Sequence, residues 1–230
     1  MNIAGIQKLT LLDYPEKTAC TIFTVGCNFR CPFCHNAELA VGEEQANVSE
    51  KEVLDYLISR RGKLDGLCIT GGEPLLQTDI LDFMEKVRSA GFLVKLDTNG
   101  SLYEKLKVIV DEKLCDYIAM DIKNVPEKYS VSAGCLVDNE NVLKSIELLK
   151  NGGVDYEFRT TVVKELNDKN DFEKIAKLLS GAKRYYLQKF RDSERVMERG
   201  FSAYSDEEMH EIQNIVKANG LEVCALRGVD

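Results

Sequence analysis

Short β-branched segments alternate with amphipathic helical segments along almost all of this 230-residue chain, and this alternation restricts the possible folds most. Strands repeat every two residues and helices every 3.6, so the two apolar patterns can be told apart. Strands are expected at residues 18–25, 67–70, 92–96, 117–122, 156–163, 185–190 and 221–226. Helices are expected at residues 49–60, where Ser49 and Glu52 form a capping box, and at 79–89, 103–112, 139–150, 171–179 and 206–218.

Six units in which a strand is followed by a helix imply an α/β fold of parallel strands covered by helices. Six units are too few for the closed eight-stranded barrel, so we expect an incomplete (β/α)6 partial barrel. The length and the 44% hydrophobic content fit a single domain over residues 1–230. Within it, residues 1–17 are expected as an N-terminal extension and residues 18–226 as the partial barrel.

Charge and targeting signals narrow the class of protein. The formal charge is −8 and the pI is about 5.0, whereas proteins that bind nucleic acid or anionic membranes usually show a basic face. The N-terminus lacks the charged-then-apolar layout of a signal peptide, and no apolar run is long enough to span a membrane. We therefore expect a cytoplasmic protein without nucleic-acid or membrane partners.

Three cysteines, Cys27, Cys31 and Cys34, form a C-x3-C-x2-C pattern in the loop after the first expected strand. A closed cubane iron–sulfur cluster is usually held by four cysteines, and a redox pair needs only two. Three ligands leave one metal with an open position, which is the property that separates catalytic from structural metal sites. The spacing therefore predicts a [4Fe–4S] cluster with one iron free to bind a substrate or cofactor.

Two other uses of these cysteines stay open at this point. Cys27, Cys31 and Cys34 with His35 make a Cys3His zinc set, although the adjacent Cys34 and His35 would have difficulty pointing at one ion. A disulfide framework is less favoured, because eight cysteines spread over 230 residues without a signal peptide indicate a reducing compartment. The other five cysteines show no short spacing, and two of them lie in expected strands, where they suit a core: Cys20, Cys68, Cys115, Cys135 and Cys224.

Candidate site residues follow, end or lie inside the next expected strands. They are Gly71, Gly72, Glu73 and Pro74; Asp97, Thr98 and Asn99; Asp121 and Lys123; Arg159; and Gln188. Each has an ordinary structural explanation, such as a βα turn, a cap or a local ion pair. In parallel folds, however, the carboxyl ends of the strands carry the functional residues, and all of these fall there.

Together these side chains suit a ligand that bears a carboxylate, an amine and a ribose. The two glycines allow a close backbone approach, and Glu73 offers a carboxylate to an ammonium group. A cluster with an open iron beside such a ligand points to S-adenosylmethionine (SAM), whose reductive cleavage gives methionine and a 5′-deoxyadenosyl radical.

The chain resembles the radical SAM superfamily over nearly its whole length. The cysteine pattern with Phe33 before the third cysteine, and the Gly71-Gly72-Glu73-Pro74 stretch, match its cluster and SAM motifs. Within the superfamily it is most similar to activating enzymes of glycyl radical enzymes, through residues 31–36, 97–100, 121–123 and 158–163. The resemblance implies SAM contacts from Phe33, Thr98, Asn99, Lys123, Arg159 and Gln188, with Asp97 and Asp121 flanking the SAM carboxylate through a monovalent cation.

Residues 6–15 resemble the activating proteins of anaerobic ribonucleoside-triphosphate reductase. This implies abstraction of a glycine Cα hydrogen from that large partner, with a flavodoxin or ferredoxin-type electron donor. Two alternatives remain: a radical SAM enzyme acting on a small molecule, such as 7-carboxy-7-deazaguanine synthase, and a non-enzymatic metal-binding or redox-sensing protein. The His35-Asn36 pair and residues 121–123 favour the activating enzyme.

Overall fold

A computed structural model describes residues 1–229. Eight strands and eight α-helices follow one another, with short 3-10 turns at Pro74–Leu76 and Pro126–Lys128. The strands are β1 Ile3–Thr10, β2 Ala19–Thr24, β3 Gly66–Gly71, β4 Leu93–Thr98, β5 Tyr117–Asp121, β6 Asp155–Val162, β7 Tyr185–Lys189 and β8 Cys224–Arg227. The helices are α1 Ala37–Val41, α2 Glu50–Ser59, α3 Ile80–Ser89, α4 Tyr103–Asp111, α5 Tyr129–Ala133, α6 Asn139–Asn151, α7 Lys169–Leu178 and α8 Asp206–Ala218.

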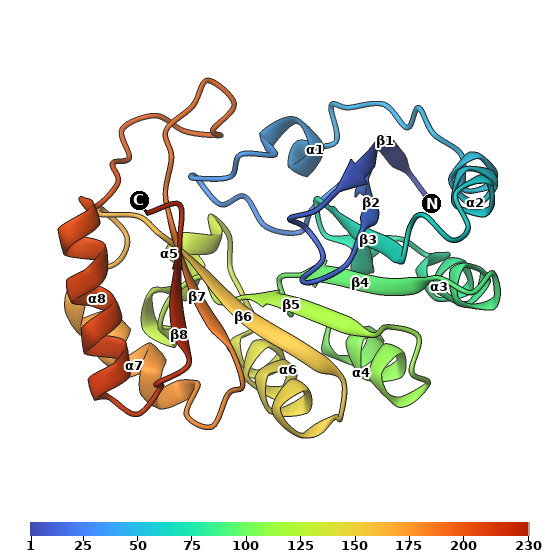
Figure 1. The fold of residues 1–230 in the computed structure, drawn as a ribbon. Coiled ribbons are helices and arrows are strands. Elements are labelled where there is room, and N and C mark those ends of the chain that lie inside the picture. Colours follow the sequence, from blue (N-terminus) through green and yellow to red (C-terminus); the bar gives the residue numbers. More distant parts are fainter. Residues whose placement is uncertain (230) are drawn as a thin grey trace.

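All eight strands belong to one sheet whose spatial order follows the sequence, β1 to β8. Strands β2 to β8 pair in parallel, whereas β1 pairs antiparallel with β2. Strands β1 and β8 stay at the two edges, so the sheet curves without closing (Figure 1). The predicted α/β partial barrel is thereby confirmed. Strand β1 was not predicted, because residues 1–17 were expected only as an extension.

The expected helices are all present within two residues of their predicted bounds, and they cover the outer face of the curved sheet (Figure 1). The capping box at the start of α2 is confirmed, since the Ser49 hydroxyl accepts from the Glu52 amide and the Glu52 carboxylate accepts from Ser49. The short helices α1 and α5 were missed. Five residues are too few to show a helical period, and isolated helices of that length are not stable in water.

Side chains alternate along the strands, and this separates a dry outer layer from a polar interior. In β3 and β4, Ile69 and Leu96 are fully buried and belong to the core that includes Phe83 of α3. Their neighbours along the strands, Cys68 and Lys95, point to the other side and contact each other. The period of two therefore gives the partial barrel an interior lined by charged and polar groups.

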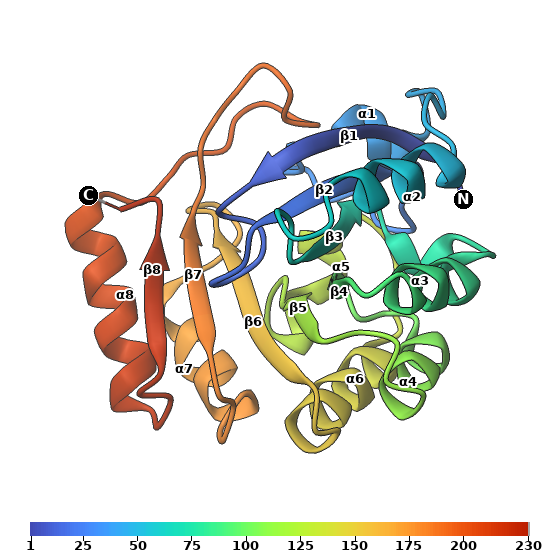
Figure 2. The same ribbon diagram turned by 45° about the vertical axis from the view of Figure 1, so that its right-hand side comes forward.

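The segment between β1 and β2 covers the amino-terminal end of this interior. Tyr14 is buried and its ring lies 6.1 Å from that of Tyr117, the first residue of β5. Figure 2 shows the segment curving back toward the middle of the sheet, while the chain that follows β7 extends over the opposite end. Within residues 1–229 there is no helix both long and apolar enough to cross a membrane.

Candidate active site

A cavity of about 270 Å³ opens at the carboxyl ends of the strands. Every residue predicted for the site lines it except Pro74, which is buried where it starts the 3-10 turn after β3. The predicted residues that line it are Cys27, Cys31, Phe33, Cys34, Gly71, Gly72, Glu73, Asp97, Thr98, Asn99, Asp121, Lys123, Arg159 and Gln188. The topology therefore brings Cys27 and Gln188, which are 161 positions apart in the sequence, to the same cavity.

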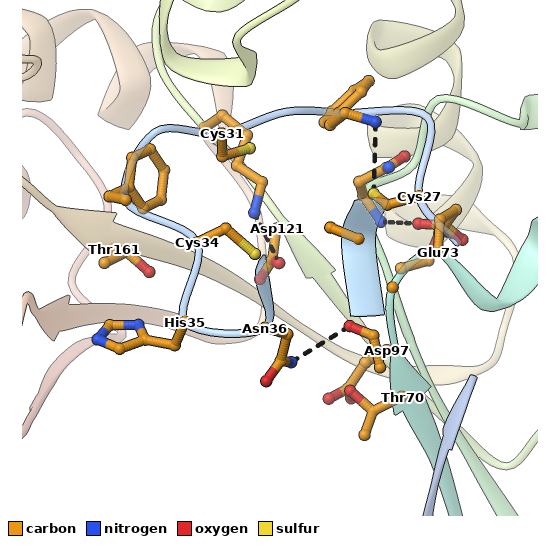
Figure 3. A pocket seen from close by; sticks show the side chains of 18 of the residues that line it. Cys27, Cys31, Cys34, His35, Asn36, Thr70, Glu73, Asp97, Asp121 and Thr161 are labelled. Carbon is orange, nitrogen blue, oxygen red and sulfur yellow. Dashed lines mark hydrogen bonds and ion pairs between the residues drawn. The ribbon is translucent and has the colours of Figure 1, made fainter. Parts of the chain in front are cut away.

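The cysteine loop arches around this cavity and is fixed by backbone hydrogen bonds (Figure 3). Before the loop, the Gly26 amide donates to Leu39 O at 2.8 Å, and the Cys27 amide donates to Ala40 O at 3.1 Å, so α1 anchors its start. Its end is held by the segment after β7, where the Met197 amide donates to Cys34 O at 3.1 Å. The thiols are thus presented by a loop that is tied down on both sides.

The three thiols suit a cluster better than a single ion. Burial raises the pKa of Cys27 to about 12 and that of Cys31 to about 11, which keeps the thiols neutral unless a cationic centre compensates. In residues 1–229, no three His, Cys, Asp or Glu side chains lie close enough to hold one metal ion. Cysteine thiolates are the usual ligands of iron–sulfur clusters, and three thiols border this one cavity, so the donor set fits such a group. His35 points away and contacts Arg191 O at 2.5 Å (Figure 3).

The two glycines after β3 are required by contacts within the protein. Gly71 has φ +118°, and a Cβ there would lie 2.3 Å from Thr24 N. A Cβ on Gly72 would lie 2.0 Å from Gly26 O. The loop after β3 therefore packs directly against the chain entering the cysteine loop, and the Glu73 amide donates to Gly26 O at 2.8 Å. The protein backbone itself therefore excludes a side chain at both positions, and the same two glycines line the cavity.

Glu73 is buried, with 1% of its surface exposed, and its carboxylate is surrounded by protein donors. Oε1 accepts from the Leu75 amide at 3.0 Å and the Thr98 hydroxyl at 2.9 Å, and Oε2 accepts from the Asn99 amide at 2.7 Å. Burial raises the pKa of Glu73 to about 7, and these hydrogen bonds oppose the rise. The carboxylate thus joins the ends of β3 and β4 as well as lining the cavity.

Charged side chains on β4, at the end of β5 and just after it, and on β6 form a connected group, which we call the pocket network: Lys95, Asp97, Asp121, Lys123 and Arg159. The Arg159 guanidinium bridges the two carboxylates, with Nη1 3.3 Å from Asp97 Oδ2 and Nε 3.0 Å from Asp121 Oδ1. Lys123 Nζ lies 3.0 Å from Asp121 Oδ2, and Lys95 pairs with Asp97 Oδ1. Figure 3 shows Asp97 and Asp121 on the floor beneath the cysteine loop.

Ion pairing overrides burial in setting the charge of this network. Burial alone would raise the pKa of Asp121, but Lys123 and Arg159 lower it to about 2. Burial likewise opposes ionisation of Lys123 and Arg159, yet the facing carboxylates raise the pKa of both. The members therefore stay charged at neutral pH, and the cavity keeps a fixed electrostatic pattern.

Several lining residues were not predicted: Phe29, His35, Asn36, Ala40, Thr70 and Thr161. Thr70 and Thr161 point inward from β3 and β6, two positions from Cys68 and Arg159, so the strand period could have identified them. Asn36 donates to Gly71 O at 3.3 Å, a contact between separate loops that no sequence pattern shows.

The remaining cysteines lie away from the cysteine triplet or at its edge. Cys20, Cys68, Cys115 and Cys224 are buried; Cys224 belongs to the hydrophobic core as expected, whereas Cys68 faces Lys95 in the polar interior. Cys135 is half-buried, and its Sγ lies 3.4 Å from Asn28 O in the cysteine loop.

Comparisons with known proteins agree with this geometry. The model of the family described as the radical SAM superfamily matches residues 21–179. A Methanocaldococcus jannaschii protein, named provisionally as a glycyl-radical enzyme activating enzyme, is 36% identical over 82% of this chain and 79% of its own length. The pyruvate formate-lyase-activating enzyme of Clostridium pasteurianum is 29% identical over 77% of this chain and 76% of its own length. The 7-carboxy-7-deazaguanine synthase of Thermoplasma acidophilum is 35% identical over 54% of this chain and 55% of its own length.

Among solved structures, Streptococcus suis SuiB bound to S-adenosylmethionine superposes with a TM-score of 0.72 at 14% identity. The match covers 89% of this chain and 49% of SuiB, and it supports the fold alone. Membership of the superfamily implies a [4Fe–4S] cluster and SAM as cofactors. The chain belongs to the radical SAM superfamily and, within it, to the group whose named members are glycyl-radical enzyme activating enzymes.

Proposed function

We propose that this chain is a single-domain enzyme that activates a glycyl radical enzyme. Cys27, Cys31 and Cys34 would hold the [4Fe–4S] cluster. With an electron from a flavodoxin or ferredoxin-type donor, the bound cluster would cleave SAM reductively to a 5′-deoxyadenosyl radical that takes a glycine Cα hydrogen from the partner. The observation that carries this proposal is that the three thiols and four of the five members of the pocket network border one cavity.

The chain's own residues would bind and orient SAM. Lys123 and Arg159 offer cationic donors to its carboxylate, and both are held in place by Asp121. Phe33 lies against the Lys123 ammonium, 5.8 Å from ring centroid to Nζ, and limits where that cation can point. Gln188, from β7, also lines the cavity and offers a neutral amide.

Glu73, Thr98 and Asn99 would shape the edge of the site that receives the SAM amine. The Glu73 carboxylate accepts hydrogen bonds from the Thr98 hydroxyl and the Asn99 amide, so a change at any of these residues would shift the other two. Gly71 and Gly72 would contribute by letting this edge pack against the cysteine loop. Binding and positioning are therefore the work of the protein, while the radical chemistry belongs to the cofactors.

We propose anaerobic ribonucleoside-triphosphate reductase as the first partner to test, because residues 6–15 resemble the activating proteins of that enzyme. Pyruvate formate-lyase is the second, because relatives bear that activating name. We propose a cytoplasmic setting, because eight free cysteines and an oxygen-sensitive cluster require reducing conditions.

A radical SAM enzyme acting on a small molecule is a second candidate. The partial match to 7-carboxy-7-deazaguanine synthase, 35% identical over 124 residues, favours it. Mixing the reconstituted, reduced protein with SAM and each large partner would separate the two. We expect a glycyl radical doublet in the electron paramagnetic resonance spectrum with one large partner. Absence of the doublet with an authentic partner would favour the second candidate.

The cluster assignment is tested by Cys31→Ala, with Cys224→Ala as the matched control from the dry core. After anaerobic reconstitution, we expect the natural protein and the control to bind about four irons and to release 5′-deoxyadenosine when SAM and dithionite are added. Cys31→Ala should lose both the visible chromophore and the product. Full iron content in Cys31→Ala would show that the ligand assignment is wrong.

A further inference from the structure

Lys95 is a buried charged residue that the proposed function leaves without a role. It lies on β4, two residues before Asp97, and only 2% of it is exposed. Its ammonium pairs with Asp97 Oδ1 and lies 3.8 Å from Cys68 Sγ. Burying a lysine is costly unless its charge is compensated, so a charge at this depth calls for an explanation.

The pairing of the two network carboxylates, Asp97 and Asp121, explains why the charge of Lys95 is buried here. All four of their oxygens pair with a cationic side chain of this chain, and Arg159 pairs with both carboxylates. Asp97 Oδ1 faces Lys95, and Asp97 Oδ2 faces Arg159. Asp121 Oδ1 faces Arg159, and Asp121 Oδ2 faces Lys123. An inorganic cation placed between these carboxylates would meet three fixed positive charges, which repel it.

This arrangement disagrees with the monovalent cation implied by the family resemblance. The residues that would flank such a cation, Asp97 and Asp121, are present, but their oxygens are already occupied by side chains of this chain. The donor set therefore does not fit a sodium or potassium ion.

The charge balance shows what the network can accept instead. Three cations face two carboxylates, which leaves one positive charge in excess. Two other buried carboxylates stand outside this count, because Glu157 is paired with Arg227 at 2.7 Å and Glu73 accepts from Leu75, Thr98 and Asn99 and from none of the three cations. Burial would lower the pKa of Lys95, but the Asp97 carboxylate raises it, so the ammonium keeps its charge.

We propose that Lys95 is a built-in counterion that replaces the monovalent cation, so that the network receives the carboxylate of SAM without an inorganic ion. Lys95 acts through Asp97 and Arg159 and is a positioning residue. This inference rests on the proposed use of SAM. It predicts that SAM affinity depends on total ionic strength and not on which monovalent cation is present.

The first experiment uses the reconstituted natural protein and needs no variant. SAM affinity is measured anaerobically by calorimetry in potassium, sodium and tetramethylammonium chloride at equal ionic strength. We expect dissociation constants that agree within about twofold, and melting temperatures that agree among the three salts. A saturable gain in affinity of about tenfold or more with potassium or sodium would overturn the proposal.

The second experiment compares Lys95→Met with Lys189→Met. Lys189 is a fitting control, because it pairs with Asp206, is mostly buried and lies outside the network. In tetramethylammonium, we expect Lys95→Met to bind SAM about tenfold more weakly and to regain affinity when potassium or sodium is added. Lys189→Met should stay within about twofold. Equal SAM affinity in Lys95→Met and the natural protein would overturn the proposal.

The two proposals fail in distinguishable ways. If SAM binds independently of the cation but no 5′-deoxyadenosine forms, the proposed function is wrong and the counterion role stands. If SAM is cleaved but binds only with potassium or sodium, the counterion role alone is wrong. If Lys95→Met does not fold, the cation series on the natural protein still decides.

Discussion

Two groups of buried charged residues lie in the interior of the partial barrel, and they differ in net charge and in whether they line the cavity. The pocket network has three cations for two carboxylates and lines the cavity through four of its five members. The second group, which we call the Glu157 cluster, consists of Tyr117, Glu157 and Arg227. Its single carboxylate accepts from the Arg227 guanidinium at 2.7 and 2.9 Å and from the Tyr117 hydroxyl at 2.8 Å, and none of its members lines the cavity.

The difference teaches which buried charges serve a ligand. The Glu157 cluster is neutral in sum, and the partners of its carboxylate come from the protein, so it acts within the fold. The pocket network carries an excess positive charge beside an opening, and a buried excess charge is unfavourable until a ligand balances it. We therefore expect changes to the network cations to act mainly on SAM binding, and changes in the Glu157 cluster to act mainly on stability.

The largest expected difference is between Arg159→Met and Arg227→Met. Arg159→Met removes the bridge between Asp97 and Asp121 and the excess charge, so we expect SAM binding to weaken about 100-fold. Arg227→Met leaves Glu157 buried without its cation and should lower the free energy of unfolding by about 3 kcal/mol, with SAM affinity within about threefold. Calorimetry and urea denaturation measure the two effects. Equal loss of SAM affinity in both variants would remove the distinction between the two groups.

A middle-sized effect is expected in the pH dependence of Asp121→Asn. The pKa of Asp121 is lowered from 3.8 to about 2 in the folded chain. A lowered folded-state pKa stabilises the fold above pH 3.8, and this contribution of about 2 kcal/mol disappears as the pH falls through 2. The natural protein should therefore exceed Asp121→Asn in unfolding free energy at pH 5, and the two should converge near pH 2. A gap that stays constant between pH 5 and pH 2 would contradict the ion pairing.

The smallest effect is expected for Tyr117→Phe, which removes one of the three donors to Glu157. Loss of this buried hydrogen bond should lower the free energy of unfolding by about 1 kcal/mol. SAM affinity should not change, because Tyr117 does not line the cavity. Thermal or urea denaturation measures the first quantity and calorimetry the second. A clear change in SAM affinity would mean that the two groups are coupled.

Local patterns predicted the regular elements well. Helices from α2 to α8, apart from the short α5, have enough turns to show a period, and strands β2 to β8 end in turn residues that the sequence marks. Strand β1 escaped prediction because its burial alternates poorly and its middle is exposed. Its place is decided by pairing with β2, a contact that only the folded sheet provides.

The candidate site could be predicted from the positions of its residues along the expected strands as well as from sequence motifs. Cys27, Cys31 and Cys34 share one short loop, and Asp97, Asp121 and Arg159 fall at or near strand ends, so their meeting could be inferred from parallel topology. The structural requirement for glycine at positions 71 and 72 could not be inferred in this way. A Cβ on Gly72 would clash with Gly26 O, which lies in a loop 46 residues earlier in the chain. Lys95 was missed because a lysine within a strand looks like a solvent-facing residue until the sheet curves around it.

The sequence by itself determined the α/β class with its parallel strands and the cysteine triplet, because periodicity and short spacing are local properties of the chain. The tertiary structure alone decided that Glu73 is enclosed by its own protein and that Lys95 fills the place next to Asp97. Both results depend on the depth of a side chain and on the atoms that face it. Those quantities arise from packing between distant segments, and packing also sets the cost of a buried charge.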